Sequence, residues 1–465
     1  MAKNCIICPR RNGSGEHTFP AALGGRRINR GIYCGHHNNK LGGHAGLLAE
    51  QLRAINAWLG VRPDRSDGPT EFVTENPIDG QSYVIAGTKV ELAAPHLLKE
   101  TEMPDGKRQI QVAFPSQQEF QRWLAEQRKA GVDLKVDGRG VWGNAFFSQP
   151  YAVRLTLGGP EGLRAVGYVA LTFLAHHFPD VARQRHLKPF RDYVLGVTND
   201  PLVWWDFDPP SPDLPAQRFR FGHRIVISLS AARQEAYARV SFFSTLSFAM
   251  PLGSARVDQD RTYLVDIDPL ADHPPHDIHE TESPLLAPVT VPTSLTAGLQ
   301  KEIQEGKAEE RFKVLLGNIF SWLLDEAARE LLPQINAARS LNAPMRQQRV
   351  REVLRSQEQR VFNLISYVVN GLKAQFLAKE TTAGIAASLD MLIASDPSSP
   401  TGINQVAICT LELGMGALTA EICRRLDVGD MDAPQLRSLL GEGPGAAIAG
   451  RAAVQPWAMH HGFTL

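Results

Sequence analysis

Four residues near the N-terminus have the side-chain types and the spacing of a metal site. Cys5 and Cys8 form a C-x-x-C pair, and Cys34 and His37 form a second pair further along the chain. Two such pairs supply the four ligands that tetrahedral Zn²⁺ prefers. His36 competes with His37 for the fourth position. A segment of roughly 60 residues buries little apolar surface by itself, so we expect a structural zinc ion to stabilise it.

A second set of chemically capable residues lies between and just after these pairs. The set consists of Glu16, His17, Pro20, Gly24, Gly25, Asn29 and Asn38. This pattern resembles the HNH endonuclease family, in the zinc-knuckle subgroup that has a ββα-metal fold, over about residues 4–50. The family usually has cysteine where this chain has His37, and histidine can replace cysteine as a zinc ligand.

The resemblance implies a role for each polar residue of this set. His17 is expected to be the general base that takes a proton from the attacking water. Glu16 and Asn38 are expected to bind a catalytic Mg²⁺ or Mn²⁺, because hard cations prefer oxygen ligands. Asn29 is expected to orient the His17 ring by a hydrogen bond. His44 is either a further ligand or phosphate contact, or a solvated histidine on a helix.

The charge of the chain is unevenly distributed. The whole chain has no net charge, but residues 1–60 contain eight basic and two acidic residues, a net charge of +6. A basic end on an otherwise mildly acidic chain indicates contact with a polyanion. The candidate phosphate contacts in this segment are Arg26, Arg27, Arg30 and Lys40.

The elements that must position these residues can be read from hydrophobic periodicity. The resemblance implies two short strands and a helix, and the apolar pattern extends that helix over Asn38–Leu59. A polar stretch at 60–69 reads as a linker. The strands expected further along are Ser82–Ile85, Gln109–Phe114, Tyr151–Leu157, His223–Leu229, Val240–Phe243 and Tyr263–Ile267. The expected helices are Ser116–Ala130, Leu163–His176, one that includes 312–324, and Pro344–Lys379.

These elements predict a multidomain α+β protein in three parts. Residues 1–60 form the zinc-stapled ββα-metal module, 70–269 a mixed α+β domain of unknown role, and 294–465 a mainly helical region for oligomerisation or regulation. Five cysteines are a poor disulfide framework, the first residues have no apolar core typical of a signal peptide, and no apolar stretch is long enough to span a membrane. We therefore expect a cytoplasmic protein that does not contact membranes.

The preferred function is a metal-dependent DNA endonuclease, with RNA as a further substrate class that the sequence leaves open. An HNH unit alone tends to cut one strand, so we expect a homodimer through the helical region. A nuclease joined to a large second region also resembles bacterial antiviral defence effectors, which is an analogy of organisation. The alternative is a zinc ribbon that binds nucleic acid without cleaving it.

Overall fold

The computed structural model describes most of the chain, in two compact units. The described residues are 4–64, 66, 68–75, 80–87, 89–104, 106–136, 155–208, 214–271, 278–283, 297–378, 383–396, 399 and 403–463. Unit 1 comprises 1–73, 84–90 and 153–319, and unit 2 comprises 74–83, 91–152 and 320–465. The units do not coincide with the expected parts 1–60, 70–269 and 294–465, and that functional division stays a prediction.

Unit 1 begins with two short strands and a helix. The elements are β1 (Glu16–His17), the 3₁₀ helix η1 (Ala21–Leu23), β2 (Ile28–Asn29), α1 (Gly35–Gln51) and α2 (Arg53–Leu59). The helix expected over Asn38–Leu59 is thus two helices, which are separated at Leu52 by a non-helical backbone. Periodicity did not reveal this break, because Leu48, Leu52 and Ile55 are all buried and continue one apolar stripe across it.

A six-stranded antiparallel sheet forms the other side of unit 1, with strand order β13-β12-β9-β10-β11-β8. Its strands are β8 (Trp204–Trp205), β9 (His223–Ser230), β10 (Glu235–Phe242), β11 (Leu246–Ser254), β12 (Arg261–Ile267) and β13 (Ile278–Ser283). The expected strands at 223–229, 240–243 and 263–267 fall on β9, β10 and β12. Of the strand expected at Tyr151–Leu157, residues 151–154 lie outside the described part, and 155–157 are not in a strand.

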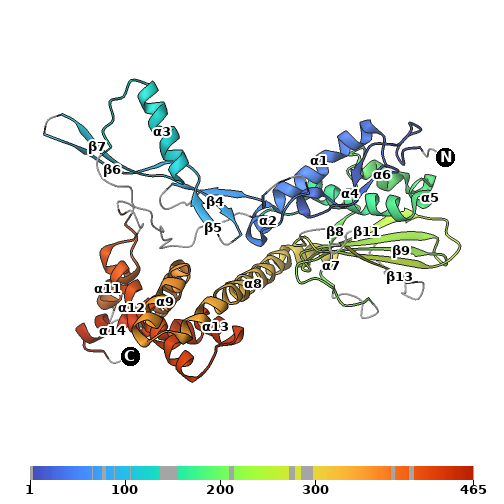
Figure 1. The fold of residues 1–465 in the computed structure, drawn as a ribbon. Coiled ribbons are helices and arrows are strands. Elements are labelled where there is room, and N and C mark those ends of the chain that lie inside the picture. The colour runs from blue at the N-terminus through green and yellow to red at the C-terminus, as the bar shows by residue number, and fades with distance from the viewer. Residues whose placement is uncertain are drawn as a thin grey trace. The chain divides into compact units, whose positions relative to one another are not determined.

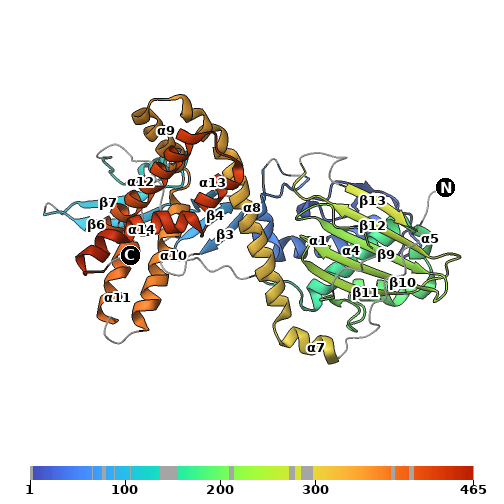
Figure 2. The same cartoon turned by 90° about the horizontal axis from the view of Figure 1, so that it is seen from below.

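Helix α4 (Gly159–His177) is the central layer of unit 1 (Figures 1 and 2). It packs against β9 and β10 on one side and against α1 on the other. A helix between two layers must be apolar all round, and the run 165–175 of α4 is buried throughout. This confirms the helix expected over Leu163–His176. The short elements α5 (Pro179–Ala182), η2 (Arg185–Leu187) and α6 (Lys188–Val194) follow, and α7 (Ala297–Gln304) comes after the sheet.

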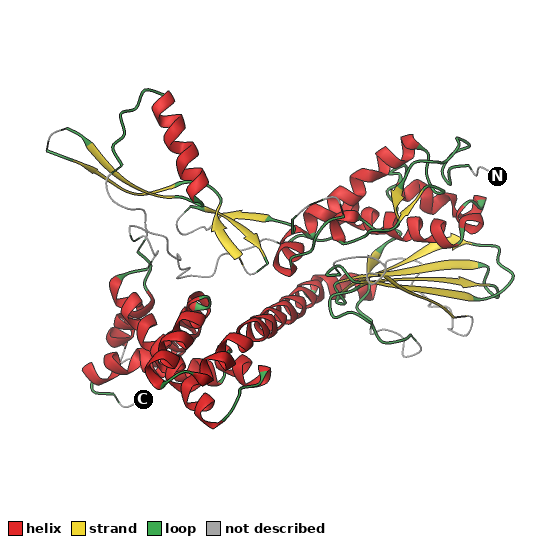
Figure 3. Cartoon of the chain, viewed as in Figure 1, coloured by secondary structure: helices red, strands yellow, loops and turns green. Residues whose placement is uncertain are grey.

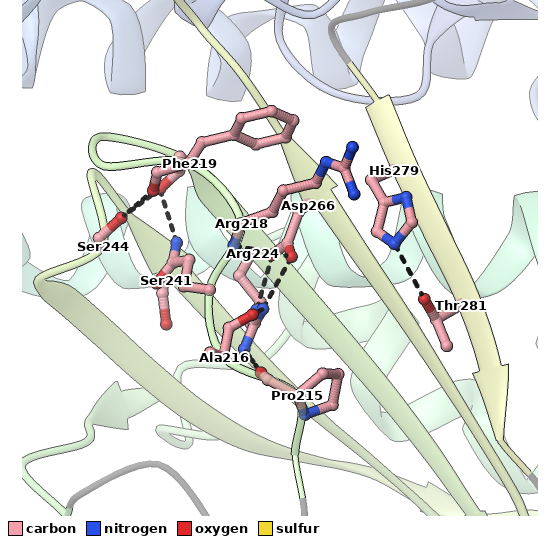
Figure 4. A network of polar contacts seen from close by, with 12 residues as sticks. Pro215, Ala216, Arg218, Phe219, Arg224, Ser241, Ser244, Asp266, His279 and Thr281 are labelled. Carbon is pink, nitrogen blue, oxygen red and sulfur yellow. Dashed lines mark hydrogen bonds and ion pairs between the residues drawn. The ribbon is translucent and has the colours of Figure 1, made fainter.

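A buried ion pair joins two neighbouring strands of this sheet (Figure 4). Arg224 of β9 donates to both carboxylate oxygens of Asp266 of β12, over 2.6 and 2.7 Å, and these residues are cross-strand partners. Arg224 also donates to the carbonyl oxygens of Pro215 and Ala216. A buried pair is tolerated when its remaining donors are hydrogen-bonded, so this network holds the chain that enters the sheet.

Unit 2 contains the C-terminal helical region (Figure 3). Its helices are the second part of α8 (Lys307–Ala337), η3 (Ala338–Ser340), α9 (Ala343–Arg355), α10 (Glu358–Leu377), α11 (Ala383–Leu389), η5 (Asp390–Ile393), α12 (Gln405–Val428), α13 (Ala433–Leu440) and α14 (Pro444–His460). Their buried apolar residues form one core cluster. The helix expected over Pro344–Lys379 is two helices, because α9 ends at Arg355 and α10 begins at Glu358. The mixed α+β class with a helical C-terminal region is confirmed.

The remaining described elements are strands β3 (Phe72–Glu75), β4 (Ser82–Ala86), β5 (Lys89–Leu92), β6 (His96–Glu102) and β7 (Arg108–Ala113), and helix α3 (Gln117–Lys129). Strands β3, β4 and β5 form one sheet and β6 and β7 a hairpin. Among the described helices, α12 alone is long and apolar enough to cross a membrane by length and composition. Its buried residues belong to the helical core of unit 2, and a core helix passes the same test.

Candidate metal centre and catalytic site

The four N-terminal ligand candidates converge on one point. Cys5 and Cys8 lie on a turn whose ends pair at Asn4 and Arg11, while Cys34 is the N-cap of α1 and His37 lies in its first turn. Local chain geometry thus brings together two short segments that are well separated in the sequence. The ligand atoms of all four residues lie within 4.8 Å of one another, so the cluster could hold a structural metal ion.

The separations between these ligand atoms fit tetrahedral zinc. His37 Nδ1 lies 3.6 Å from Cys5 Sγ and 3.4 Å from Cys34 Sγ, and the Sγ atoms of Cys8 and Cys34 are 3.8 Å apart. With ordinary zinc bond lengths, the edges of a tetrahedron are about 3.8 Å between two sulfurs and about 3.6 Å between sulfur and nitrogen. The structure therefore places His37, rather than His36, in the cluster.

The protein environment favours the metal-binding protonation states of two ligands. Burial by itself raises the pKa of Cys34, but hydrogen bonds from the His37 backbone and from neighbouring thiols bring the pKa below its ordinary value. Burial also lowers the pKa of His37, and the charges of His36, Lys40 and Arg10 lower it further. A thiolate and a neutral imidazole are the forms that bind a metal ion.

The strands β1 and β2 distribute the second set of residues over two faces. Glu16 pairs with Asn29 and His17 pairs with Ile28. Residues opposite each other on antiparallel strands share a face, and successive residues alternate. Glu16 and Asn29 therefore share the face that contacts α4, whereas His17 and Ile28 lie on the other face.

The side chain of Glu16 is buried against α4. Only 7% of this residue is exposed, and Tyr168 of α4 donates a hydrogen bond to Glu16 Oε1. Burial, and then the negative charge of Glu16, raise the pKa of Tyr168 well above its ordinary value. The tyrosine hydroxyl is consequently a stable donor that orients the carboxylate. No sequence pattern indicates Tyr168, because this residue lies far along the chain in an apolar helix.

The hydrogen bond expected between Asn29 and His17 is not formed. Asn29 Oδ1 accepts a hydrogen bond from the backbone N–H of Gly31 over 2.6 Å, and Asn29 Nδ2 lies 2.6 Å from His176 Nδ1. The reason is the alternation of side chains, which turns Asn29 toward α4 and away from His17. The His17 ring instead contacts Asp64, with 3.0 Å between Nε2 and Oδ2. Asp64 lies in the stretch that the sequence indicated to be a linker.

Asn38 lies in the first turns of α1, beside the start of β1. Its Nδ2 atom is 3.5 Å from the carbonyl oxygen of Gly15, the residue before Glu16. Its Oδ1 atom is buried and has no hydrogen-bond partner among the described residues. A buried acceptor without a partner is costly. An amide oxygen in this state, on the helix turn beside the backbone of β1, fits the ligand preference of a hard divalent cation.

The candidate phosphate contacts fall into two pairs. Arg26 donates to the carbonyl oxygen of Ala271 over 2.6 Å, and Arg27 forms an ion pair with Glu280. Both therefore have protein partners in unit 1, and contact with phosphate stays a prediction for them. By contrast, the other two candidates, Arg30 and Lys40, are exposed.

His44 is neither an exposed helix residue nor part of the metal cluster. Its Nε2 atom lies 2.8 Å from the carbonyl oxygen of Val194, and its ring contacts Tyr168 at 5.9 Å between centroids. Burial lowers the pKa of His44. A neutral ring that donates to a backbone carbonyl joins α1 to the end of α6, so we assign it a structural role.

A second group of metal-capable side chains lies where α4 meets β13. His176, His177 and Glu280 bring one ligand atom each within 4.8 Å of the others. The Gly31 N–H fixes the orientation of the Asn29 amide, so Asn29 Nδ2 donates to His176 Nδ1. The proton of the neutral His176 ring is then on Nε2, which disfavours metal binding by that nitrogen. Arg27, paired with Glu280, further disfavours a cation there.

Comparisons with known proteins give no relative for this chain: no family model, no curated protein and no solved structure matches it. The arrangement of its residues is therefore the basis for its function. That arrangement consists of a four-residue cluster that could hold a metal ion, a two-stranded ribbon (β1 and β2) with a buried acid and a histidine, and a helix with an amide oxygen beside the ribbon.

Proposed function

We propose that this chain is a metal-dependent endonuclease of the HNH type that hydrolyses phosphodiester bonds of DNA. The observation that carries the proposal is the buried, unpartnered Oδ1 of Asn38 beside the strand that bears Glu16 and His17. The order strand, strand, helix, with the four-ligand cluster at the start of the helix, agrees with the ββα-metal fold that the sequence resembles. Control of this activity by the rest of the chain, as in bacterial defence effectors, is part of the proposal.

Each residue of the set has a defined task in this reaction. Zn²⁺ held by the cluster fixes the first turn of α1, and thereby Asn38, relative to the Cys5–Cys8 turn. Glu16 and Asn38 hold Mg²⁺ or Mn²⁺, and Tyr168 orients the Glu16 carboxylate. When bound, this cation neutralises charge on the scissile phosphate. His17 accepts the proton of the attacking water.

Two exposed cations contribute to binding of the substrate. Arg30 directly follows β2, and Lys40 lies on α1 two residues after Asn38. Both are exposed, and neither position requires the side chain for packing. We assign them contacts with the phosphate backbone, which position the substrate without reading its sequence.

The alternative function is a nucleic-acid-binding module without cleavage activity. Two observations favour it: Glu16 and His17 lie on opposite faces of the β1–β2 pair, and each already contacts a protein side chain, Tyr168 and Asp64 respectively. A zinc ribbon that only binds needs neither an acid next to a histidine nor an amide oxygen beside them. The presence of all three is the reason that cleavage is preferred.

A plasmid-nicking assay in Mg²⁺ or Mn²⁺ separates these functions. We expect the full-length protein to convert supercoiled plasmid to nicked circles, and His17→Ala to lower the rate by roughly 10²- to 10⁴-fold, the usual contribution of a general base. His186→Ala changes an exposed histidine of unit 1 and serves as the matched control. Zinc content should be the same in all three proteins.

The outcomes have distinct meanings. Equal nicking by wild type and His17→Ala would show that a contaminating nuclease or another site is responsible. Retarded migration of plasmid without nicking, in both proteins, would favour the binding module.

A further inference from the structure

The stretch after α2, residues 60–70, folds back against the segment that contains β1 and β2. The backbone N–H of Val61 donates to Asn56, and that of Thr70 donates to Val61 over 2.8 Å. The N–H of Asp64 lies 3.4 Å from the carbonyl oxygen of Ala21, in the loop that follows β1. These contacts attach the described part of the expected linker, 60–69, to the segment around β1, and they bring Asp64 next to the loop that directly follows His17.

The contact between Asp64 and His17 has the geometry of an oriented acid–imidazole pair. His17 Nε2 and Asp64 Oδ2 are 3.0 Å apart, and the side chains are 11% and 27% exposed, respectively. The carboxylate can only accept a hydrogen bond when ionised, so it fixes the proton of a neutral ring on Nε2. Nδ1 is then the nitrogen with the free electron pair.

We infer that Asp64 is a positioning residue that orients the His17 ring. The resemblance to HNH endonucleases implies this role for Asn29. This inference rests on the proposed function. In the reaction, the oxygen of the attacking water forms a bond to phosphorus while the bond from phosphorus to the 3′ oxygen breaks. The water proton moves to Nδ1 of His17, and the departing 3′ oxygen takes a proton from solvent. Asp64 stabilises the imidazolium that results, without accepting its proton.

The negative charge of Asp64 also opposes binding of the substrate. A carboxylate beside the phosphodiester repels a polyanion, and the partial exposure of Asp64 limits this effect without removing it. Removal of the charge should therefore affect catalysis and binding in opposite directions. A merely structural role for Asp64 would not produce this separation.

The experiment compares variants of the full-length protein with plasmid as substrate and Mg²⁺ or Mn²⁺ as the metal. For Asp64→Ala we expect kcat to fall about 10- to 100-fold, as for other groups that orient a functional histidine, with KM unchanged or lower. Asp64→Glu should restore part of kcat, because it returns the charge. Glu71→Gln removes an exposed carboxylate from the same stretch, and it should leave both constants unchanged.

Two results would overturn the inference. If wild type nicks plasmid and Asp64→Ala has the same or a higher kcat, Asp64 does not orient the base, and a higher kcat would mean that it obstructs His17. If kcat and KM change only in proportion to lost thermal stability, the role is structural. Absence of nicking by wild type would instead overturn the proposed function, and this inference with it.

Discussion

Cys34 has two roles at one position of the backbone. It is the N-cap residue of α1, in an extended conformation, and its thiol belongs to the metal cluster. The first N–H groups of a helix have no partners within the helix and stabilise negative charge. The helix therefore favours the Cys34 thiolate, and a metal ion bound there would in turn fix where α1 begins. Asn38 depends on this start, because it lies in the first turns of the same helix.

Replacement of one cysteine should expose this dependence. We expect Cys5→Ser to lose zinc on dialysis against a chelator and to lower the melting temperature, because binding of structural zinc supplies about 10 kcal/mol or more of folding free energy. Zinc per chain by emission spectrometry and thermal unfolding measure the two effects. Cys409→Ser, at an exposed position of α12, should behave as wild type. Full zinc retention by Cys5→Ser would contradict the assignment of this ligand.

The sequence predicts residues of this site well where their spacing is local. The two ligand pairs are short motifs, and the structure brings them together. Asp64, Tyr168 and His176 were not predicted, because each lies far along the chain from the side chain that it contacts. The composition of the 60–69 stretch and of the apolar helix α4 does not indicate that their side chains contact β1 and β2. The partner of Asn29 was predicted wrongly, since the resemblance gave its position but not the face of the ribbon.

The loop between β1 and β2 is held by backbone geometry and by packing on the sheet. Gly24 has a φ of +87°, and a Cβ atom at Gly25 would lie 2.1 Å from the carbonyl oxygen of Phe19. The Phe19 ring packs against His223 of β9, with centroids 4.8 Å apart. The Gly-Gly pair is thus required by a tight loop, which turns Phe19 into the core of unit 1.

His223, the buried histidine that packs against Phe19 of this loop, predicts that the free energy of unfolding depends on pH. Burial lowers the pKa of His223 from 6.5 to about 3. Between these values the unfolded chain binds a proton that the folded protein does not, so stability falls as the pH is lowered from 6.5 toward 3. The expected loss is about 1.4 kcal/mol per pH unit in that range. Denaturant unfolding at pH 7, 6 and 5 measures it.

His223→Leu is the control for this prediction, because leucine has a similar volume and cannot be protonated. The variant loses a hydrogen bond from the Phe243 N–H, but that loss is the same at each pH. The difference between the two proteins then isolates the contribution of His223 from that of the other titratable groups, which both proteins share. An identical pH dependence in wild type and variant would refute the buried, neutral state.

Elements were predicted best where one period continues without interruption. The buried helix α4 and strands β9 and β12 were expected close to their observed bounds. The breaks between α1 and α2 and between α9 and α10 were missed, because the apolar stripe continues through each break. Side-chain periodicity reports which face is buried, and it contains little information on where a helix turns.

In the whole molecule, the N-terminal segment 1–60 is not a separate body. Arg26, Arg27 and His44 contact Ala271, Glu280 and Val194, all within unit 1. The ion pair of Arg27 with Glu280 neutralises part of the positive charge of this segment, which composition alone does not reveal. The two compact units are built from interleaved stretches of sequence, and so linear composition could not define them.

The oligomeric state of the whole molecule is a further prediction. We propose a homodimer through the helical region, whose exposed apolar side chains include Tyr367 and Leu377, at 57% and 54% exposure. Sedimentation at micromolar concentration should give twice the chain mass of 51.1 kDa. Leu377→Glu should weaken association, whereas Val197→Glu, at an exposed position of unit 1, should not. A monomer of wild type under these conditions would contradict the proposal.

The contacts of α4 with the ribbon limit how this protein can be rearranged. Tyr168 and His176 hold the buried acid and amide of β1 and β2 from a helix much further along the chain. A short N-terminal fragment grafted onto another protein would lose these partners, and the face of β1 and β2 that α4 covers would be left exposed. The N-terminal motif therefore depends on α4 for its structure. A chimaera that transfers this motif to another protein should include the whole of unit 1.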